Sequence, residues 1–252
     1  MNEIDTDWNI KFRNDIVRLI KSKNLTKTSD FKLEELHNVV DEEHKHYDFN
    51  SGVNKFSEFL YETDEEFLRL YHQFIVYLYE EVFDYDFYFQ SNPTIRIHFP
   101  NSKNAHHYPR YHTDCQYGHP PQETNMWFSL TKNNDTGFSV LNLKNSKELL
   151  DIYENDWDKL TYDAINKKSF NLLLDDLSNK VESSLSKIYY FNSLCLHTNQ
   201  PREKDTRVSI DIRINSVDDF VDGYIGKGRM KAEFKPDGKF GYYKYSAKKL
   251  KI

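Results

Sequence analysis

Two histidines and one carboxylate in this sequence could share a metal ion. His112 and Asp114 are separated by one residue, and on a strand such side chains point to the same side, about 6.5 to 7 Å apart along the backbone. His197 follows at the end of an apolar stretch. Two imidazoles and one carboxylate bind one face of an iron(II) ion and leave positions open for further ligands. Because the chain has 10 histidines, a His-x-Asp triplet alone is weak evidence, and the interpretation depends on all three residues.

Arg207 and Ser209 form a second group that could bind an anion. Arg207 comes ten residues after His197, and Ser209 shares its face of a predicted strand. A guanidinium can bind a carboxylate through two parallel hydrogen bonds, and a nearby hydroxyl adds a third donor. A dicarboxylic acid that chelates a metal at one end needs such a partner at the other. The alternative is that Arg207 belongs to an exposed strand face with Asp211 and Arg213, and the residues alone leave both interpretations open.

The elements that must position these residues are mainly strands. The clearest is residues 207–214, where branched apolar residues occupy every even position and polar residues every odd one. Such alternation predicts a strand with one packed face and one face toward water or a polar cavity. Similar patterns or apolar runs predict further strands at 94–99, 125–130, 138–143 and 187–196.

The first third of the chain reads as helical. Apolar residues recur at helical spacing in residues 9–23, from about residue 29 or 30 onward, and in residues 64–83. Residues 145–186 are polar and helix-compatible, which predicts an insertion between strands. We therefore expect one α+β domain, mainly β, over 1–252. Its parts are helical support at 1–90, a β core at 91–216 with the insertion at 145–186, and a C-terminal extension at 217–252.

Composition excludes several classes of function. The net charge is −6 and the basic residues are dispersed except near the C-terminus, which does not predict a nucleic-acid partner. No window approaches the roughly 18 apolar residues of a membrane span, and the N-terminus lacks the regions of a signal peptide. Two cysteines predict no disulfide framework, so we expect a cytoplasmic protein. The expected partner is a small molecule, with neither nucleic acid nor membrane. A homo-oligomer is compatible with the sequence, which leaves the oligomeric state open.

The motifs resemble those of the iron(II)/2-oxoglutarate-dependent dioxygenases. Within these, they are most similar to the oxygenases of streptomycin-type and sporadic carbohydrate biosynthesis clusters. The likeness covers about residues 90–215, and one departure is Thr198, where a glycine is commoner. The matching segments are 93–98 (PTIRIH), 111–119 (YHTDCQYGH), 125–131 (NMWFSLT), 197–199 (HTN) and 206–213 (TRVSIDIR).

This resemblance implies a double-stranded β-helix, also called a cupin-like jelly roll, supported by N-terminal helices. His112, Asp114 and His197 would be the Fe(II) ligands, and Arg207 and Ser209 would hold the distal carboxylate of 2-oxoglutarate. The cofactor and cosubstrates implied are Fe(II), 2-oxoglutarate and O₂, and the products succinate, CO₂ and an oxidised substrate. Related halogenases lack the carboxylate ligand, so Asp114 favours hydroxylation or a similar oxidation.

Five further residues are candidates for contacts in the site. Asn125 could donate a hydrogen bond to the cosubstrate or orient a metal ligand, and its alternative is a satisfied core amide. Arg96 and His98 share a strand face and could contact substrate. Asn199, two residues past His197, could face an open metal position, and Tyr117 either contacts substrate or packs.

Three functions fit these observations. The first is an oxygenase acting on a small polar metabolite such as a sugar, an aminoglycoside or a nucleotide sugar, a preference that rests on family resemblance alone. The second is a protein or peptide hydroxylase of the same superfamily, for which a wide, charged mouth would be evidence. The third is a non-catalytic, cupin-like binding or structural protein whose histidine cluster holds zinc or nothing. Arg207 and Ser209 argue against the third, because a zinc-binding protein has no use for a carboxylate clamp.

Overall fold

A computed structural model describes residues 1–48, 53–100, 110–117, 119–132, 136–200 and 204–219. Its larger sheet has six strands. Five of them follow the order β1-β9-β6-β11-β4, and the sixth, β5, also pairs with β11, beside β4. Every pairing in it is antiparallel. The strands are β1 (Asn2–Asp5), β4 (Phe87–Phe89), β5 (Thr94–His98), β6 (Thr124–Ser129), β9 (Lys187–Asn192) and β11 (Arg207–Ser216).

A smaller antiparallel sheet completes the β core. Its three strands run in the order β10-β7-β8 and comprise β10 (His197–Asn199), β7 (Thr136–Val140) and β8 (Asn179–Glu182). Aromatic side chains of both sheets pack together, because Trp127 of β6 lies 4.7 Å from Phe138 of β7 between ring centroids. A separate pair of short strands, β2 (Tyr47–Asp48) and β3 (Val53–Asn54), lies outside these sheets.

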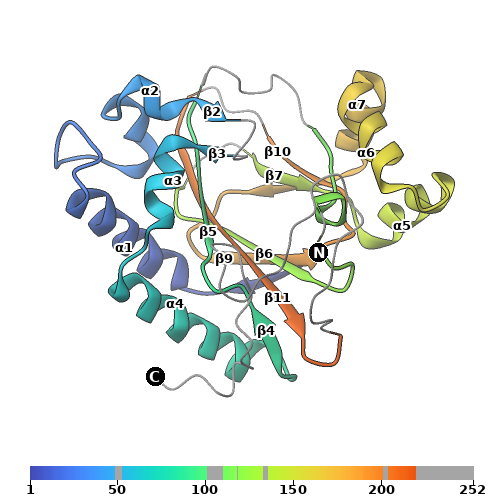
Figure 1. Ribbon diagram of the computed structural model, residues 1–252, viewed down its shortest axis with the longest axis horizontal. Coiled ribbons are helices and arrows are strands. Elements are labelled where there is room, and N and C mark those ends of the chain that lie inside the picture. The colour runs from blue at the N-terminus through green and yellow to red at the C-terminus, as the bar shows by residue number, and fades with distance from the viewer. Residues whose placement is uncertain (49–52, 101–109, 118, 133–135, 201–203, 220–252) are drawn as a thin grey trace.

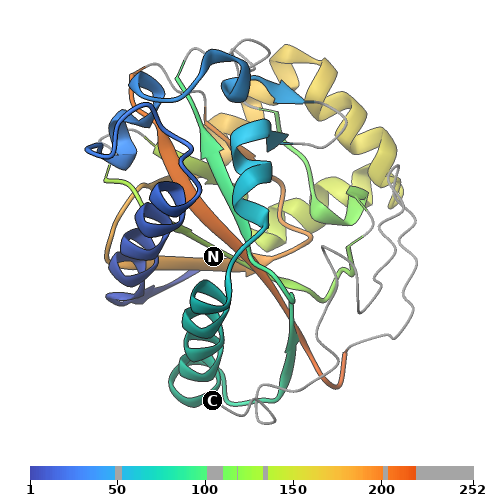
Figure 2. The ribbon, with the colours of Figure 1, turned by 60° about the vertical axis from the view of Figure 1, so that its left-hand side comes forward.

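Helices of the first third cover one face of the larger sheet (Figure 1, Figure 2). Phe12 of α1 (Trp8–Ser22) contacts Phe74 of α4 (Glu65–Tyr77) and Phe128 of β6, at ring-centroid distances of 5.5 and 5.4 Å. Helix α4 begins after Asp64, whose carboxylate accepts a hydrogen bond from the Phe67 amide at 2.9 Å. These helices are α1 (Trp8–Ser22), a 3₁₀ helix (Leu33–Asn38), α2 (Glu42–Lys45), α3 (Lys55–Tyr61), α4 (Glu65–Tyr77) and a π-helical turn (Leu78–Val82).

The segment between β7 and β8 forms three helices on the opposite side of the molecule from α1 and α4 (Figure 1). They are α5 (Leu143–Ile152), α6 (Trp157–Asn166) and α7 (Lys168–Leu177). The predicted insertion is therefore helical, but it ends in β8, a strand that the sequence did not predict. The strand prediction for 138–143 was wrong at its end, because Asn142 caps α5 by accepting from the Asn145 amide at 2.8 Å.

Strand β11 joins the core to the site. Its even residues are buried against the helices and its odd residues lie on the opposite face. The prediction of a mixed fold with helices and antiparallel sheets is confirmed, but the expectation that it is mainly β was wrong, because more of the described residues lie in helices than in strands. Most of the predicted C-terminal extension, 220–252, lies outside the described residues. Among the described helices, none has the length and apolar character needed to cross a membrane. The buried even residues are Val208, Ile210, Ile212 and Ile214.

Candidate metal centre

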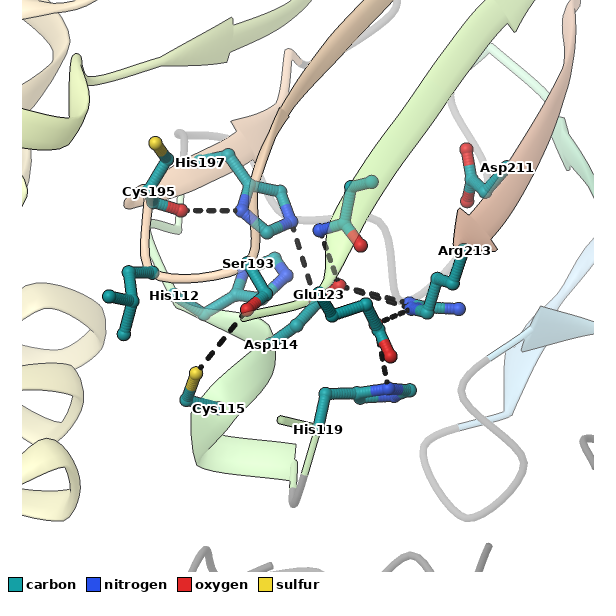
Figure 3. Close-up of polar contacts among 12 residues, drawn as sticks. His112, Asp114, Cys115, His119, Glu123, Ser193, Cys195, His197, Asp211 and Arg213 are labelled. Atoms are coloured by element: carbon teal, nitrogen blue, oxygen red, sulfur yellow. Dashed lines mark hydrogen bonds and ion pairs between the residues drawn. The ribbon is translucent and has the colours of Figure 1, made fainter. Parts of the chain in front are cut away.

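The structure brings His112, Asp114 and His197 together. Each offers one ligand atom, and these atoms all lie within 4.8 Å of one another (Figure 3). The Nε2 atom of His197 is 3.6 Å from Asp114 Oδ1, and the two imidazole centroids are 4.5 Å apart. Distant parts of the chain are thus joined at one point with the donor set expected for a 2-His-1-carboxylate site.

Backbone pairing fixes the two histidines relative to each other. The His112 amide donates to the His197 carbonyl at 3.0 Å, and the His197 amide donates back at 2.9 Å. The expectation that His112 and Asp114 share a strand was wrong, because His112 forms an isolated bridge and Asp114 begins a 3₁₀ helix, Asp114–Tyr117. The Asp114 amide donates to Ser193 O at 3.2 Å. Convergence therefore comes from a turn that is anchored to the segment before His197.

Hydrogen bonds at Nδ1 leave Nε2 of each imidazole available for a metal. The Nδ1 atom of His112 is 3.1 Å from the Arg110 carbonyl, and that of His197 is 2.9 Å from the Cys195 carbonyl. A carbonyl only accepts, so we infer that each Nδ1 carries the hydrogen and each Nε2 a lone pair. Burial, helped by the neighbouring His197, lowers the pKa of His112 to about 3. His112 is therefore neutral at pH 7, as a metal ligand must be.

One oxygen of Asp114 is occupied by donors and the other faces the histidines. Asp114 Oδ2 accepts from Asn125 Nδ2 at 2.7 Å and from Arg213 Nη2 at 3.1 Å. Burial opposes ionisation of Asp114, but Arg213 and the neighbouring His197, His119 and His112 together outweigh it and hold the pKa of Asp114 well below the usual range. Of the two roles that the sequence left open for Asn125 in the site, this hydrogen bond favours orienting a ligand.

Sequence reasoning missed a buried charge network behind Asp114. Arg213 Nε lies 3.2 Å from Glu123 Oε1, which is also 3.1 Å from His119 Nδ1 (Figure 3). Glu123 is fully buried, which raises its pKa. Arg213 stands at an odd-numbered position of β11, on the same face as Arg207, and this placement could have indicated the charge network. Glu123, just before β6, carried no comparable signal.

Arg207 is fully buried, which contradicts the exposed-face alternative. Its Nη2 donates to Asn199 Oδ1 at 2.5 Å and to His98 Nδ1 at 3.1 Å. Its guanidinium carbon lies 5.9 Å from the Trp127 ring centroid. Asn199 is two residues beyond His197 on β10, one strand repeat of about 6.5 to 7 Å along the backbone, so Arg207 contacts the segment that carries His197.

Ser209 also lies in this buried region. It stands opposite Ser129 of β6 and Arg96 of β5, and it is fully buried. Within the described part of the chain, its hydroxyl has no hydrogen-bond partner. A buried hydroxyl without a partner is costly, so the neighbourhood of Arg207 fits an additional polar ligand.

The other predicted contacts are distributed around the same face. His98 and Asn199 both accept hydrogen bonds from Arg207. Arg96 forms an ion pair with Asp211 of β11, and both side chains are partly exposed. Tyr117 packs edge-on against His112, with ring centroids 5.4 Å apart. All four therefore lie next to either the candidate metal donors or the odd face of β11.

No protein-family model matches the chain, and no curated protein matches it either. Three solved structures are similar over most of its length. The apo form of the non-heme monooxygenase ThoJ is 10% identical over 86% of this chain and 73% of its own, with a TM-score of 0.42. SnoK, an alpha-ketoglutarate-dependent carbocyclase from nogalamycin biosynthesis, is 9% identical over 82% and 74%, with a TM-score of 0.36. The iron-bound non-heme oxygenase OrfP is 13% identical over 82% and 78%, with a TM-score of 0.31. Since these TM-scores lie below 0.5, the likeness assigns neither family nor function.

Proposed function

We propose that this chain is an iron(II)- and 2-oxoglutarate-dependent oxygenase that hydroxylates or otherwise oxidises a small polar metabolite. The convergence of His112, Asp114 and His197 carries the proposal. Both imidazoles present Nε2, and Asp114 presents one carboxylate oxygen while its other oxygen is held by Asn125 and Arg213. Three donors on one face of iron leave the remaining positions for cosubstrate and O₂.

The clamp residues support 2-oxoglutarate as the cosubstrate. Arg207 would bind its distal carboxylate through parallel hydrogen bonds, and the partnerless hydroxyl of Ser209 would add a donor. Asn199 would orient the guanidinium through the hydrogen bond that it already accepts. The Trp127 ring beside Arg207 excludes water, which strengthens these charge-assisted contacts.

When bound, iron(II) with O₂ and 2-oxoglutarate supplies oxidation of a C–H bond, with release of succinate and CO₂. The chain's own residues hold the reactants in place. Arg96 and Asp211, the partly exposed ion pair on the face that carries Arg207, would contact the polar substrate. We further infer that the two sheets form a double-stranded β-helix, and that the substrate is a sugar, an aminoglycoside or a nucleotide sugar. The sugar preference rests on the motif resemblance.

Anaerobic spectroscopy tests the proposal directly. Iron(II) and 2-oxoglutarate together should give a weak visible charge-transfer band, which His112→Ala should abolish. His72→Ala, at a half-buried histidine of α4, serves as the control and should keep the band. Succinate release should then be screened against sugars and nucleotide sugars. Metal binding without any response to 2-oxoglutarate would instead indicate a non-catalytic metal-binding protein.

A further inference from the structure

The helical segment between β7 and β8 contacts the residues that immediately precede both candidate histidine ligands. Tyr111 precedes His112 and Leu196 precedes His197, and both are fully buried. The Leu196 amide donates to Ser146 Oγ of α5 at 3.1 Å. Tyr111 and Leu196 pack in one cluster with residues of the helical segment and of the turn before it. That cluster also contains Leu141, Leu150, Leu160, Ala164 and Leu174.

One carboxylate of this helical segment accepts hydrogen bonds from both histidine-bearing segments. Asp175 Oδ1 of α7 accepts from the Tyr111 hydroxyl at 3.0 Å and from Gln200 Nε2 at 2.8 Å. Gln200 follows β10 and also donates to Ser139 of β7. The other oxygen of Asp175 pairs with Lys180 of β8. A single oxygen atom therefore joins a residue next to His112 to a residue three positions beyond His197.

We propose that Asp175 is a positioning residue that fixes the separation of His112 and His197, and hence the affinity of the centre for its metal. This inference rests on the proposed function, because it concerns the same three metal donors. The backbones of His112 and His197 are joined by one pair of hydrogen bonds. The Arg110 amide also donates to Thr198 Oγ1 at 2.8 Å, and Asp175 adds a further side-chain connection from the helical segment, so it restrains sliding and opening of the two histidine-bearing segments. The helical segment is then part of the metal centre rather than a separate attachment.

The chain supplies a matched control for this carboxylate. Asp163 of α6 also accepts from a tyrosine hydroxyl, that of Tyr153 at 2.9 Å, and pairs with a lysine, Lys167 at 2.8 Å. These partners lie within the helical segment itself. Replacing Asp163 therefore removes the same types of bond without touching Tyr111 or Gln200.

The experiment is a titration of the full chain with Co(II), followed by the visible absorption of the bound ion. Asp175→Ala should weaken Co(II) binding about 10- to 100-fold, the effect typical of residues that orient metal ligands. Asp175→Asn should restore most of the affinity, because an amide oxygen still accepts from Tyr111 and Gln200. Asp163→Ala should bind Co(II) as the wild type does. Tyr111→Phe removes only one of the two donors to Asp175 Oδ1. It provides a milder variant should Asp175→Ala fail to fold.

A second readout needs no metal. In the metal-free protein, Asp175→Ala should accelerate hydrogen exchange at the His112 and His197 amides, which donate to each other's carbonyls, and Asp163→Ala should leave both unchanged. Wild-type affinity in Asp175→Ala, or an equal loss in Asp163→Ala, would overturn the inference. Failure of the proposed function looks different, because the wild type itself would then bind no Co(II), or would bind it without responding to 2-oxoglutarate.

Discussion

Replacement of Arg207 separates cosubstrate binding from metal binding. Arg207→Met keeps an unbranched side chain beside Trp127 but removes the charge and all donors. A hydrogen bond to a charged group contributes about 1.5–3 kcal/mol, so two parallel bonds to a carboxylate contribute roughly 3–6 kcal/mol. At about 1.4 kcal/mol per tenfold change, the affinity for 2-oxoglutarate should fall at least about 100-fold. Arg207→Lys should lose less, because it keeps the charge but not the planar pair of donors.

The assay is calorimetric titration of 2-oxoglutarate into the Co(II)-loaded protein without oxygen. Co(II) affinity itself should stay at the wild-type value, because Arg207 donates to Asn199 and His98, neither of which is one of the three proposed metal donors. Arg18→Met, at a partly exposed arginine of α1 paired with Asp15 and Asp64, is the control for loss of a cation. An unchanged 2-oxoglutarate affinity in Arg207→Met would refute the clamp, whatever happens to activity.

Three further perturbations test the site and its surroundings. Burial lowers the pKa of His112 to about 3, whereas the unfolded chain takes up a proton near 6.5. Acidifying the metal-free protein from pH 7 to 5 should therefore cost up to about 2 kcal/mol of stability through this group, a loss that His112→Gln should remove in urea unfolding. Arg213→Met leaves the buried Glu123 without this cation and should destabilise the fold by about 3–5 kcal/mol, whereas a cost typical of an exposed pair would argue against the network. In Gly137→Ala the new Cβ would lie 2.6 Å from Trp127 Cη2, so the thermal midpoint should fall by the equivalent of about 1–3 kcal/mol, and an unchanged midpoint would mean that the ring moves freely.

The parts of this fold with strong periodicity could be predicted from the sequence. A helix was expected over residues 9–23 and α1 spans Trp8–Ser22, and the alternating residues 207–214 form most of β11. In both, burial of one face determines which residues are apolar, so local sequence carries the information. The helix expected from residue 29 or 30 is instead a 3₁₀ helix, Leu33–Asn38, in which Leu33 and Leu36 are buried.

Other features depend on contacts that local sequence does not encode. β1 and β8 have four residues each, too few for a pattern to be distinctive. The convergence of His112 with His197 required recognition of a motif, since their pairing is long-range. The turn at Asp114 could not be foreseen, because its amide bonds to Ser193, a residue of another segment.

The alternation of β11 makes the hydrophobic core determine the geometry of the site. Because side chains alternate between faces, a slip of one residue would move Arg207 and Arg213 into the apolar layer and expose the branched residues. Four buried branched residues on the even face oppose that slip. Burying each contributes on the order of 1.5–3 kcal/mol, well above a typical hydrogen bond. The odd face can therefore carry two buried guanidiniums, one beside Asp114 and one beside Asn199, without strand register depending on their own costly burial.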